Sequence, residues 1–181
     1  MPPEDPREMA REVFTVPNAL SLLRLAMVPV VVVLLFMRAD VTAVVVFILA
    51  AITDFLDGAL ARRTRPTLVG KILDPVADRL MLSSAAVVLA IRGELPIWVV
   101  AILVGRDLLA LVGGLAFGKK ISVNLVGKAA TALLMVAVAL IIFSPGTLGE
   151  IIFYAGFGLS LVAGLLYVIN ISRVSGGGGT T

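Results

Sequence analysis

Apolar runs of about 20 residues recur along the whole chain, and this feature constrains the fold more than any other. A helix needs about 20 consecutive apolar residues to cross the hydrocarbon core of a bilayer. Apolar residues make up 60% of the 181 residues and charged residues only 15%, which excludes a water-soluble globule of this size. The chain is therefore predicted to be an all-α integral membrane protein.

The runs divide the chain into six predicted membrane-spanning helices, at 17–37, 41–62, 70–91, 95–117, 122–143 and 148–171. Because the links between them are short, neighbouring helices are expected to pack antiparallel in one bundle, a membrane domain over 17–172. Residues 1–16 form a cytoplasmic segment without a cleavable signal peptide, either an amphipathic surface helix or a disordered tail. The glycine-rich residues 173–181 are expected to be a flexible tail.

The distribution of Lys and Arg predicts the orientation of the bundle. Two basic residues, Arg38 and Arg92, fall on one side of the membrane. The opposite side collects nine: Arg7, Arg11, Arg62, Arg63, Arg65, Lys71, Lys119, Lys120 and Arg173. Loops rich in Lys and Arg stay in the cytoplasm. Both termini and the 62–71 link are therefore expected on the cytoplasmic side of the cell's inner or plasma membrane.

The chain contains neither cysteine nor histidine, and this limits the chemistry that it can perform. Thiolate nucleophiles, imidazole bases and Cys- or His-based metal sites are excluded. Carboxylates, Lys, Arg and hydroxyls remain. Oxygen ligands suit hard cations, so the metal candidates are Mg²⁺, Mn²⁺ and Ca²⁺.

Four of the 12 acidic residues fall in the stretch DFLDGALARRTRPTLVGKILDPVAD, between two apolar runs. Asp54 and Asp57 are spaced i,i+3, and Asp74 and Asp78 are spaced i,i+4, so each pair lies on one face of its helix. A short basic link lets the two helices run antiparallel, which brings the two acidic faces together. Four converging carboxylates repel one another unless cations lie among them, and a pair of divalent metal ions fits this need best.

Other charges also fall inside apolar runs, where they are costly and usually face a cavity or one another. These residues are Arg24, Arg79, Arg106, Asp107 and Lys128. Arg62, Arg106 and Lys128 are candidates for contact with a phosphate group. Two interpretations of Arg106 and Asp107 stay open, an internal ion pair and a role in binding substrate. Gly58 likewise fits either close approach of a ligand or close helix packing.

With these residues in view, the stretch resembles the signature of the CDP-alcohol phosphatidyltransferase family, D-x-x-D-G-x-x-A-R, a spacer, then G-x-x-x-D-x-x-x-D. The matching positions are Asp54, Asp57, Gly58, Ala61, Arg62, Gly70, Asp74 and Asp78. The spacer holds seven residues where the family usually has eight. The resemblance implies a six-helix membrane bundle with a cytoplasm-facing polar cavity, and a homodimer.

The resemblance also implies a role for each matching residue. Asp54, Asp57 and Asp74 would bind two divalent ions, Mg²⁺ or Mn²⁺, with Asp78 close to or sharing that site and acting as general base. The CDP part of the donor, CDP-diacylglycerol, would be held by Gly58, Ala61 and Arg62, with Gly70 packing beside it. An acceptor hydroxyl would attack the lipid-linked phosphorus and release CMP. No nucleic-acid partner is expected.

The acceptor alcohol is predicted from fewer residues. The start TVPNALSLLRL resembles the glycerol phosphate and cardiolipin branches of the family. The pair Arg106 and Asp107 looks more like the cardiolipin synthase branch, and this resemblance favours phosphatidylglycerol over glycerol 3-phosphate as acceptor. An inositol phosphate acceptor is an alternative that calls for more basic residues than Arg106 and Lys128. A membrane ion transporter built on the acidic cluster is an alternative of a different class.

Overall fold

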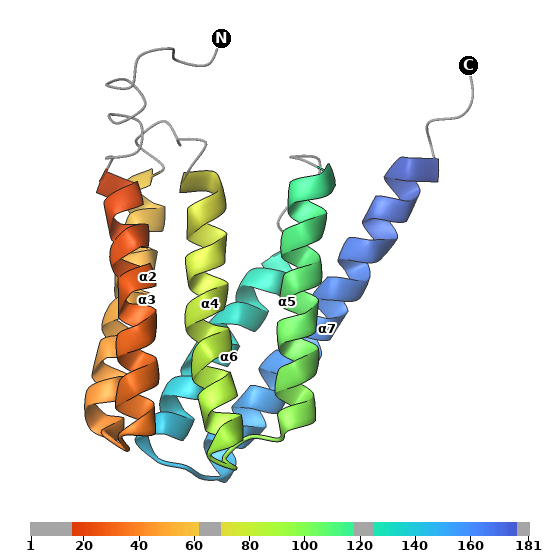
Figure 1. The fold of residues 1–181 in the computed structure, drawn as a ribbon. Coiled ribbons are helices and arrows are strands. Elements are labelled where there is room, and N and C mark those ends of the chain that lie inside the picture. Colours follow the sequence, from red (N-terminus) through yellow and green to blue (C-terminus); the bar gives the residue numbers. More distant parts are fainter. Residues whose placement is uncertain (1–15, 62–69, 118–124, 177–181) are drawn as a thin grey trace. The chain divides into compact units, whose positions relative to one another are not determined.

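The computed structural model describes residues 16–61, 70–117 and 125–176, with side chains described for 19–53, 76–110, 112 and 126–166. The described chain folds into helices alone, as Figure 1 shows. They are α2 (Val16–Phe36), α3 (Asp40–Ala61), α4 (Gly70–Ile91), α5 (Ile97–Phe117), α6 (Leu125–Phe143) and α7 (Thr147–Gly176).

The six predicted helices are confirmed, with ends that mostly fall within three residues of the predicted ones. The exception is α7, which was predicted to end at residue 171 and continues to Gly176. Residues 173–176 are therefore helical, and the prediction that they belong to a flexible tail is wrong. Nothing in Arg173, Val174 and Ser175 breaks a helix, whereas a run of glycines does. The predicted surface helix at the N-terminus lies outside the described residues.

The surface of the helices is apolar, as a bilayer requires. Large apolar side chains that include Val33, Ile48, Ile102, Val136 and Leu165 are at least 43% exposed. A surface of this kind would aggregate in water but is solvated by lipid tails. Within the described residues, three helices are long and apolar enough to span a membrane by length and composition, at Ala19–Phe36, Val126–Phe143 and Thr147–Leu166. The chain is thus a membrane protein, and the full set of six spans remains a prediction.

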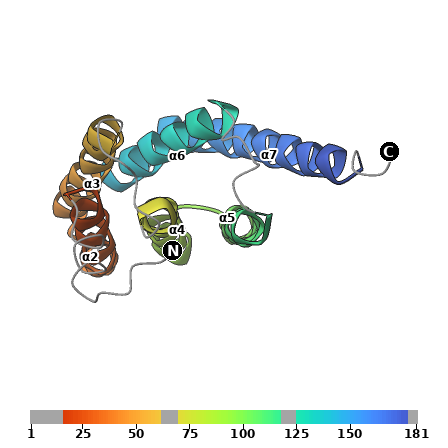
Figure 2. The same ribbon diagram turned by 90° about the horizontal axis from the view of Figure 1, so that it is seen from above.

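The chain divides into two compact units, Met1–Val88 and Leu89–Thr181. In the first unit, α2 and α3 lie side by side in both views (Figures 1 and 2). Their buried apolar side chains include Val31, Leu35, Ala43, Phe47 and Ala50. Arg38 closes the turn between them at a φ of 59°, and the amide of Ala39 donates to the carbonyl of Leu34. This left-handed helix ending is normally occupied by glycine.

In the second unit, α6 and α7 are joined by a three-residue turn and pack closely along their length. The contacts follow one row on each helix. A Cβ built on Gly127 would lie 3.8 Å from that of Ala163, one on Gly156 would lie 3.1 Å from Leu134, and one on Gly149 would lie 2.7 Å from Ile141. Both rows advance by seven residues, in opposite directions. This is the repeat of two antiparallel helices that wind around each other with a left-handed twist.

Gly156 is predicted to be required for this packing. Its Cβ position lies 3.1 Å from the backbone nitrogen of Leu134, which cannot move aside as a flexible side chain can. Gly156→Ala is therefore expected to lower the free energy of unfolding by about 1–3 kcal/mol, as overpacked cores do. Thermal unfolding of the purified protein in detergent measures the change.

Gly158 on the same helix is the matched control, because nothing lies within 4 Å of its Cβ position. Gly158→Ala is expected to be neutral or slightly stabilising, since alanine favours a helix more than glycine does. Equal midpoints for the two variants would contradict the close packing of α6 and α7.

Candidate active site

The two predicted acidic pairs lie on helix ends that point to the same end of the first unit. Asp54 and Asp57 belong to the last turns of α3, and Asp74 and Asp78 belong to the first turns of α4. Figure 1 shows the last turn of α3 and the first turns of α2 and α4 at the same end of the first unit. The antiparallel arrangement expected from the short link is thus present in the backbone.

Most of the predicted site lies outside the described side chains. This applies to Asp54, Asp57, Gly58, Ala61, Gly70 and Asp74, whereas Arg62 lies outside the described residues altogether. The convergence of the carboxylates therefore stays a prediction. Asp78 is the one predicted site residue of this unit whose side chain is described.

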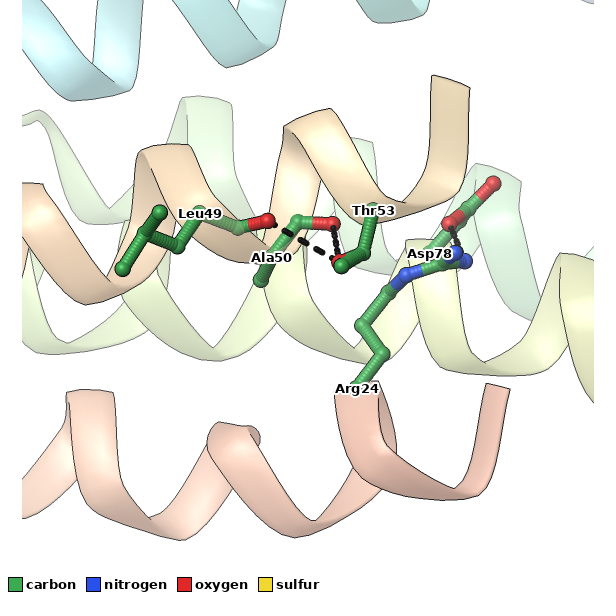
Figure 3. A network of polar contacts seen from close by, with 5 residues as sticks. All are labelled: Arg24, Leu49, Ala50, Thr53 and Asp78. Carbon is green, nitrogen blue, oxygen red and sulfur yellow. Dashed lines mark hydrogen bonds and ion pairs between the residues drawn. The ribbon is translucent and has the colours of Figure 1, made fainter. Parts of the chain in front are cut away.

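Asp78 forms an ion pair with Arg24 of α2. The guanidinium Nη1 of Arg24 donates to the Oδ1 of Asp78 over 2.5 Å, as Figure 3 shows. The two side chains differ in exposure, since that of Arg24 is 2% exposed and that of Asp78 is 26% exposed. The guanidinium of Arg24 is therefore buried inside the unit, while the side chain of Asp78 is partly exposed.

Arg24 is a residue that the sequence did not connect with the acidic stretch. Its charge inside an apolar run indicates a partner, but 54 positions separate it from Asp78. Spacing within one helix gives no information about pairs on different helices. The available signal was that α2 contains no other charged residue, so the partner of Arg24 had to come from another segment.

Thr53 lies immediately before Asp54 and turns its hydroxyl back onto its own helix. Its Oγ1 donates to the carbonyls of Leu49 and Ala50, over 2.9 Å and 2.8 Å (Figure 3). These bonds satisfy the hydroxyl within α3, as is usual for Ser and Thr in apolar helices. Thr53 is therefore held by its own helix next to the first acidic residue.

The donor set of the stretch fits a hard divalent cation. Its metal-binding side chains are carboxylates, on successive turns of two helices that point to the same end of the unit. Among the described side chains there is no group of three or more metal-binding residues, and three of the four aspartates are outside that set. The ligands of the metal therefore remain a prediction.

The second unit contains the pair Arg106 and Asp107. The Nη1 of Arg106 donates to the Oδ1 of Asp107 over 3.1 Å, and the side chains are 18% and 9% exposed. The predicted internal ion pair is thus present. This contact leaves open the other interpretation, in which Arg106 also binds a substrate.

Lys128 is exposed on α6, and Arg106 lies on α5. Adjacent residues of α7 link the two. Ala163 lies against Gly127, the neighbour of Lys128, and a Cβ on Gly164 would lie 3.8 Å from the Cγ of Arg106. The helix α7 therefore contacts α5 at Arg106 and α6 beside Lys128, although these two basic residues are 22 positions apart in the sequence.

Together these features define a helical membrane protein with carboxylates suited to divalent cations and with basic residues suited to phosphate groups. Residues 14–162 match the family model for CDP-alcohol phosphatidyltransferase. The chain belongs to this family, and the predicted resemblance is confirmed. It is accordingly a transferase of phospholipid biosynthesis.

Three relatives of the chain are named for glycerol-based lipids or acceptors. It is 38% identical to the CMP-forming cardiolipin synthase of Streptomyces coelicolor, over 96% of this chain and 93% of the relative. It is 35% identical to the CDP-diacylglycerol–glycerol-3-phosphate 3-phosphatidyltransferase of Salmonella choleraesuis, over 84% of this chain and 88% of the relative. A second such transferase, from Arabidopsis thaliana, is 33% identical over 96% of this chain and 86% of the relative.

Asp107 is predicted to stabilise the second unit through Arg106. Asp107→Asn removes the negative charge and leaves the amide as a weaker acceptor. The free energy of unfolding is expected to fall by about 1–3 kcal/mol, the usual range for a hydrogen bond to a charged group. Asp107→Glu keeps the carboxylate and is expected to lose less. A thermal unfolding midpoint that Asp107→Asn leaves unchanged would show that the ion pair does not support the fold.

Proposed function

We propose that the protein transfers a phosphatidyl group from CDP-diacylglycerol to a hydroxyl of a glycerol-based acceptor and releases CMP. The observation that carries this proposal is the complete eight-position signature from Asp54 to Asp78 within a family match over 14–162. Phosphatidylglycerol is the acceptor favoured here, which makes the enzyme a cardiolipin synthase. The 38% identity to a protein of that name supports this choice, together with Asp107.

Glycerol 3-phosphate is the second candidate acceptor. It is supported by relatives named as glycerol-3-phosphate phosphatidyltransferases, at 35% and 33% identity. Both acceptors carry a phosphate group next to free hydroxyls of a glycerol unit. The same basic residues, Arg106 and Lys128, would therefore serve for either acceptor.

The reaction exchanges one phosphate ester bond for another. The oxygen of the acceptor hydroxyl forms a bond to the lipid-linked phosphorus, and the bond from that phosphorus to the CMP oxygen breaks with its electron pair. The proton of the hydroxyl passes to the carboxylate of Asp78, which acts as general base. Asp78 suits this role because its carboxylate is partly exposed while its partner Arg24 is buried.

Asp54, Asp57 and Asp74 would hold two divalent ions, Mg²⁺ or Mn²⁺, with Asp78 at the edge of the same site. When bound, such ions neutralise the charge on the transferred and leaving phosphates. Arg62, Gly58 and Ala61 would hold the CDP part of the donor, and Gly70 leaves room beside it. Each of these roles follows from the family signature.

The membrane setting suits this chemistry. CDP-diacylglycerol is anchored in the bilayer by its acyl chains, while CMP is soluble. We place the site at the cytoplasmic boundary with both termini on the same side, because Lys and Arg gather on the loops there. A homodimer is part of this proposal through the family resemblance.

The proposal predicts CMP release that depends on the acceptor. Purified protein with labelled CDP-diacylglycerol and Mg²⁺ or Mn²⁺ is expected to release CMP fastest with phosphatidylglycerol, more slowly with glycerol 3-phosphate, and not with inositol phosphate. Chelation of the divalent cation is expected to stop release.

Folded protein that releases no CMP with any acceptor would contradict the transferase function. Uptake of ions by proteoliposomes would then test the transporter alternative. Faster release with glycerol 3-phosphate than with phosphatidylglycerol would overturn only the choice of acceptor.

Asp78→Asn is predicted to abolish turnover while CDP-diacylglycerol binding is retained, because the amide cannot take the proton. General bases contribute about 100-fold to 10,000-fold to a rate, so a loss of that size is expected. Glu94→Gln is the matched control, since it removes the carboxylate of another ion pair, the one with Arg92 in the turn after α4. Wild-type turnover in Asp78→Asn would remove Asp78 from the mechanism.

A further inference from the structure

Arg24 lies where a charged residue is hard to accommodate. It is the only charged residue of α2 and falls inside the candidate span Ala19–Phe36. Its side chain is 2% exposed, so it cannot extend to the membrane surface as basic side chains near helix ends do. A leucine would fill a buried position of a spanning helix at far lower cost. The guanidinium must therefore serve an interaction that an apolar residue cannot make.

That interaction is the contact with Asp78, and the two ends of the ion pair differ. Arg24 is enclosed, whereas Asp78 keeps 26% of its side chain exposed. The pair Arg92 and Glu94 provides a comparison within the same chain. There the two side chains are 5% and 12% exposed, as expected for a contact that only closes the turn after α4. The exposed carboxylate of Asp78 distinguishes its pair from this structural one.

We propose that Arg24 is a positioning residue, which holds the carboxylate of Asp78 in the direction that the reaction requires. This inference rests on the proposed function, because Asp78 acts there as general base. The contact uses Nη1 and Oδ1, so the carboxylate is fixed by a group on a different helix (Figure 3). Without it, the carboxylate loses a contact that restrains its rotation about its last bond. Arg24 itself touches neither substrate nor metal in this account.

Such control of direction matters because a general base must lie within hydrogen-bond reach of the proton that it takes. Misplacing a catalytic group by about 1 Å can cost about 100-fold in rate. The guanidinium is suited to the task because its donors form a rigid planar fork, whereas the ammonium of lysine is a single point on a flexible chain. The inference therefore predicts different effects for Met and Lys at position 24.

The test compares Arg24→Met, Arg24→Lys and the control Arg92→Met, which breaks the structural ion pair. For each variant, the unfolding midpoint, the Kd of CDP-diacylglycerol, and the kcat and KM of CMP release are measured. Arg24→Met is expected to lower kcat by about 100-fold, with the KM and Kd of the donor nearly unchanged. Arg24→Lys is expected to restore part of kcat, leaving a loss of about tenfold. Arg92→Met is expected to lower the midpoint while kcat stays near that of the wild type.

The outcomes distinguish a failure of the proposed function from a failure of the positioning role of Arg24. Wild-type protein that releases no CMP overturns the proposed function and this inference with it. Wild-type release together with an unchanged kcat in Arg24→Met overturns this inference alone. A loss of kcat in Arg92→Met as large as that in Arg24→Met also overturns it, since the effect then reflects stability. If Arg24→Met does not fold, Arg24→Lys decides: a reduced kcat at an unchanged KM supports positioning, and a wild-type kcat refutes it.

Discussion

The guanidinium of Arg24 needs a counter-charge inside the membrane, and much of the first unit follows from this need. A charge in a spanning helix is stable only beside an opposite charge or a polar cavity. Asp78 supplies that charge from α4, which ties α2 to the helix that carries the second acidic pair. The side chain of Asp78 stays 26% exposed in this contact. The proposed chemistry of Asp78 thus depends on an ion pair with a second helix.

The second unit is held together differently. Its α6 and α7 approach closely because small residues recur every seventh position on α7, at Gly149, Gly156 and Ala163. Lipid tails are as apolar as leucine side chains, so apolar residues alone do not drive helices together in a bilayer, and close packing must do so instead. Next to Ala163 of this seam, Gly164 of α7 lies against Arg106 of α5. The two residues proposed to bind the acceptor phosphate, Arg106 and Lys128, thus belong to the two helices that contact α7 at these positions.

Much of the fold and part of the site were readable in advance. The length and number of the apolar runs predicted six helices, and the short links between the runs predicted antiparallel neighbours. The predicted end of α7 is wrong, because Arg173, Val174 and Ser175 before the glycine run continue the helix. The eight-position signature predicted the family and hence the class of reaction. The acceptor rests on Asp107 and on the relatives, because residues that contact an alcohol come from several helices and share no fixed spacing.

By itself the sequence determined that the chain is a helical membrane protein, that its chemistry has neither thiol nor imidazole to use, and that each acidic pair shares a helix face. These properties follow from composition and from spacing within single helices, which need no knowledge of neighbours. Only the tertiary structure decided that Arg24 is the partner of Asp78 and that Ala163 and Gly164 link Arg106 with Gly127. Contacts between helices depend on how the helices rotate and pack. That arrangement is set by the whole chain, because every helix must bury its charges and fit its small residues against a neighbour.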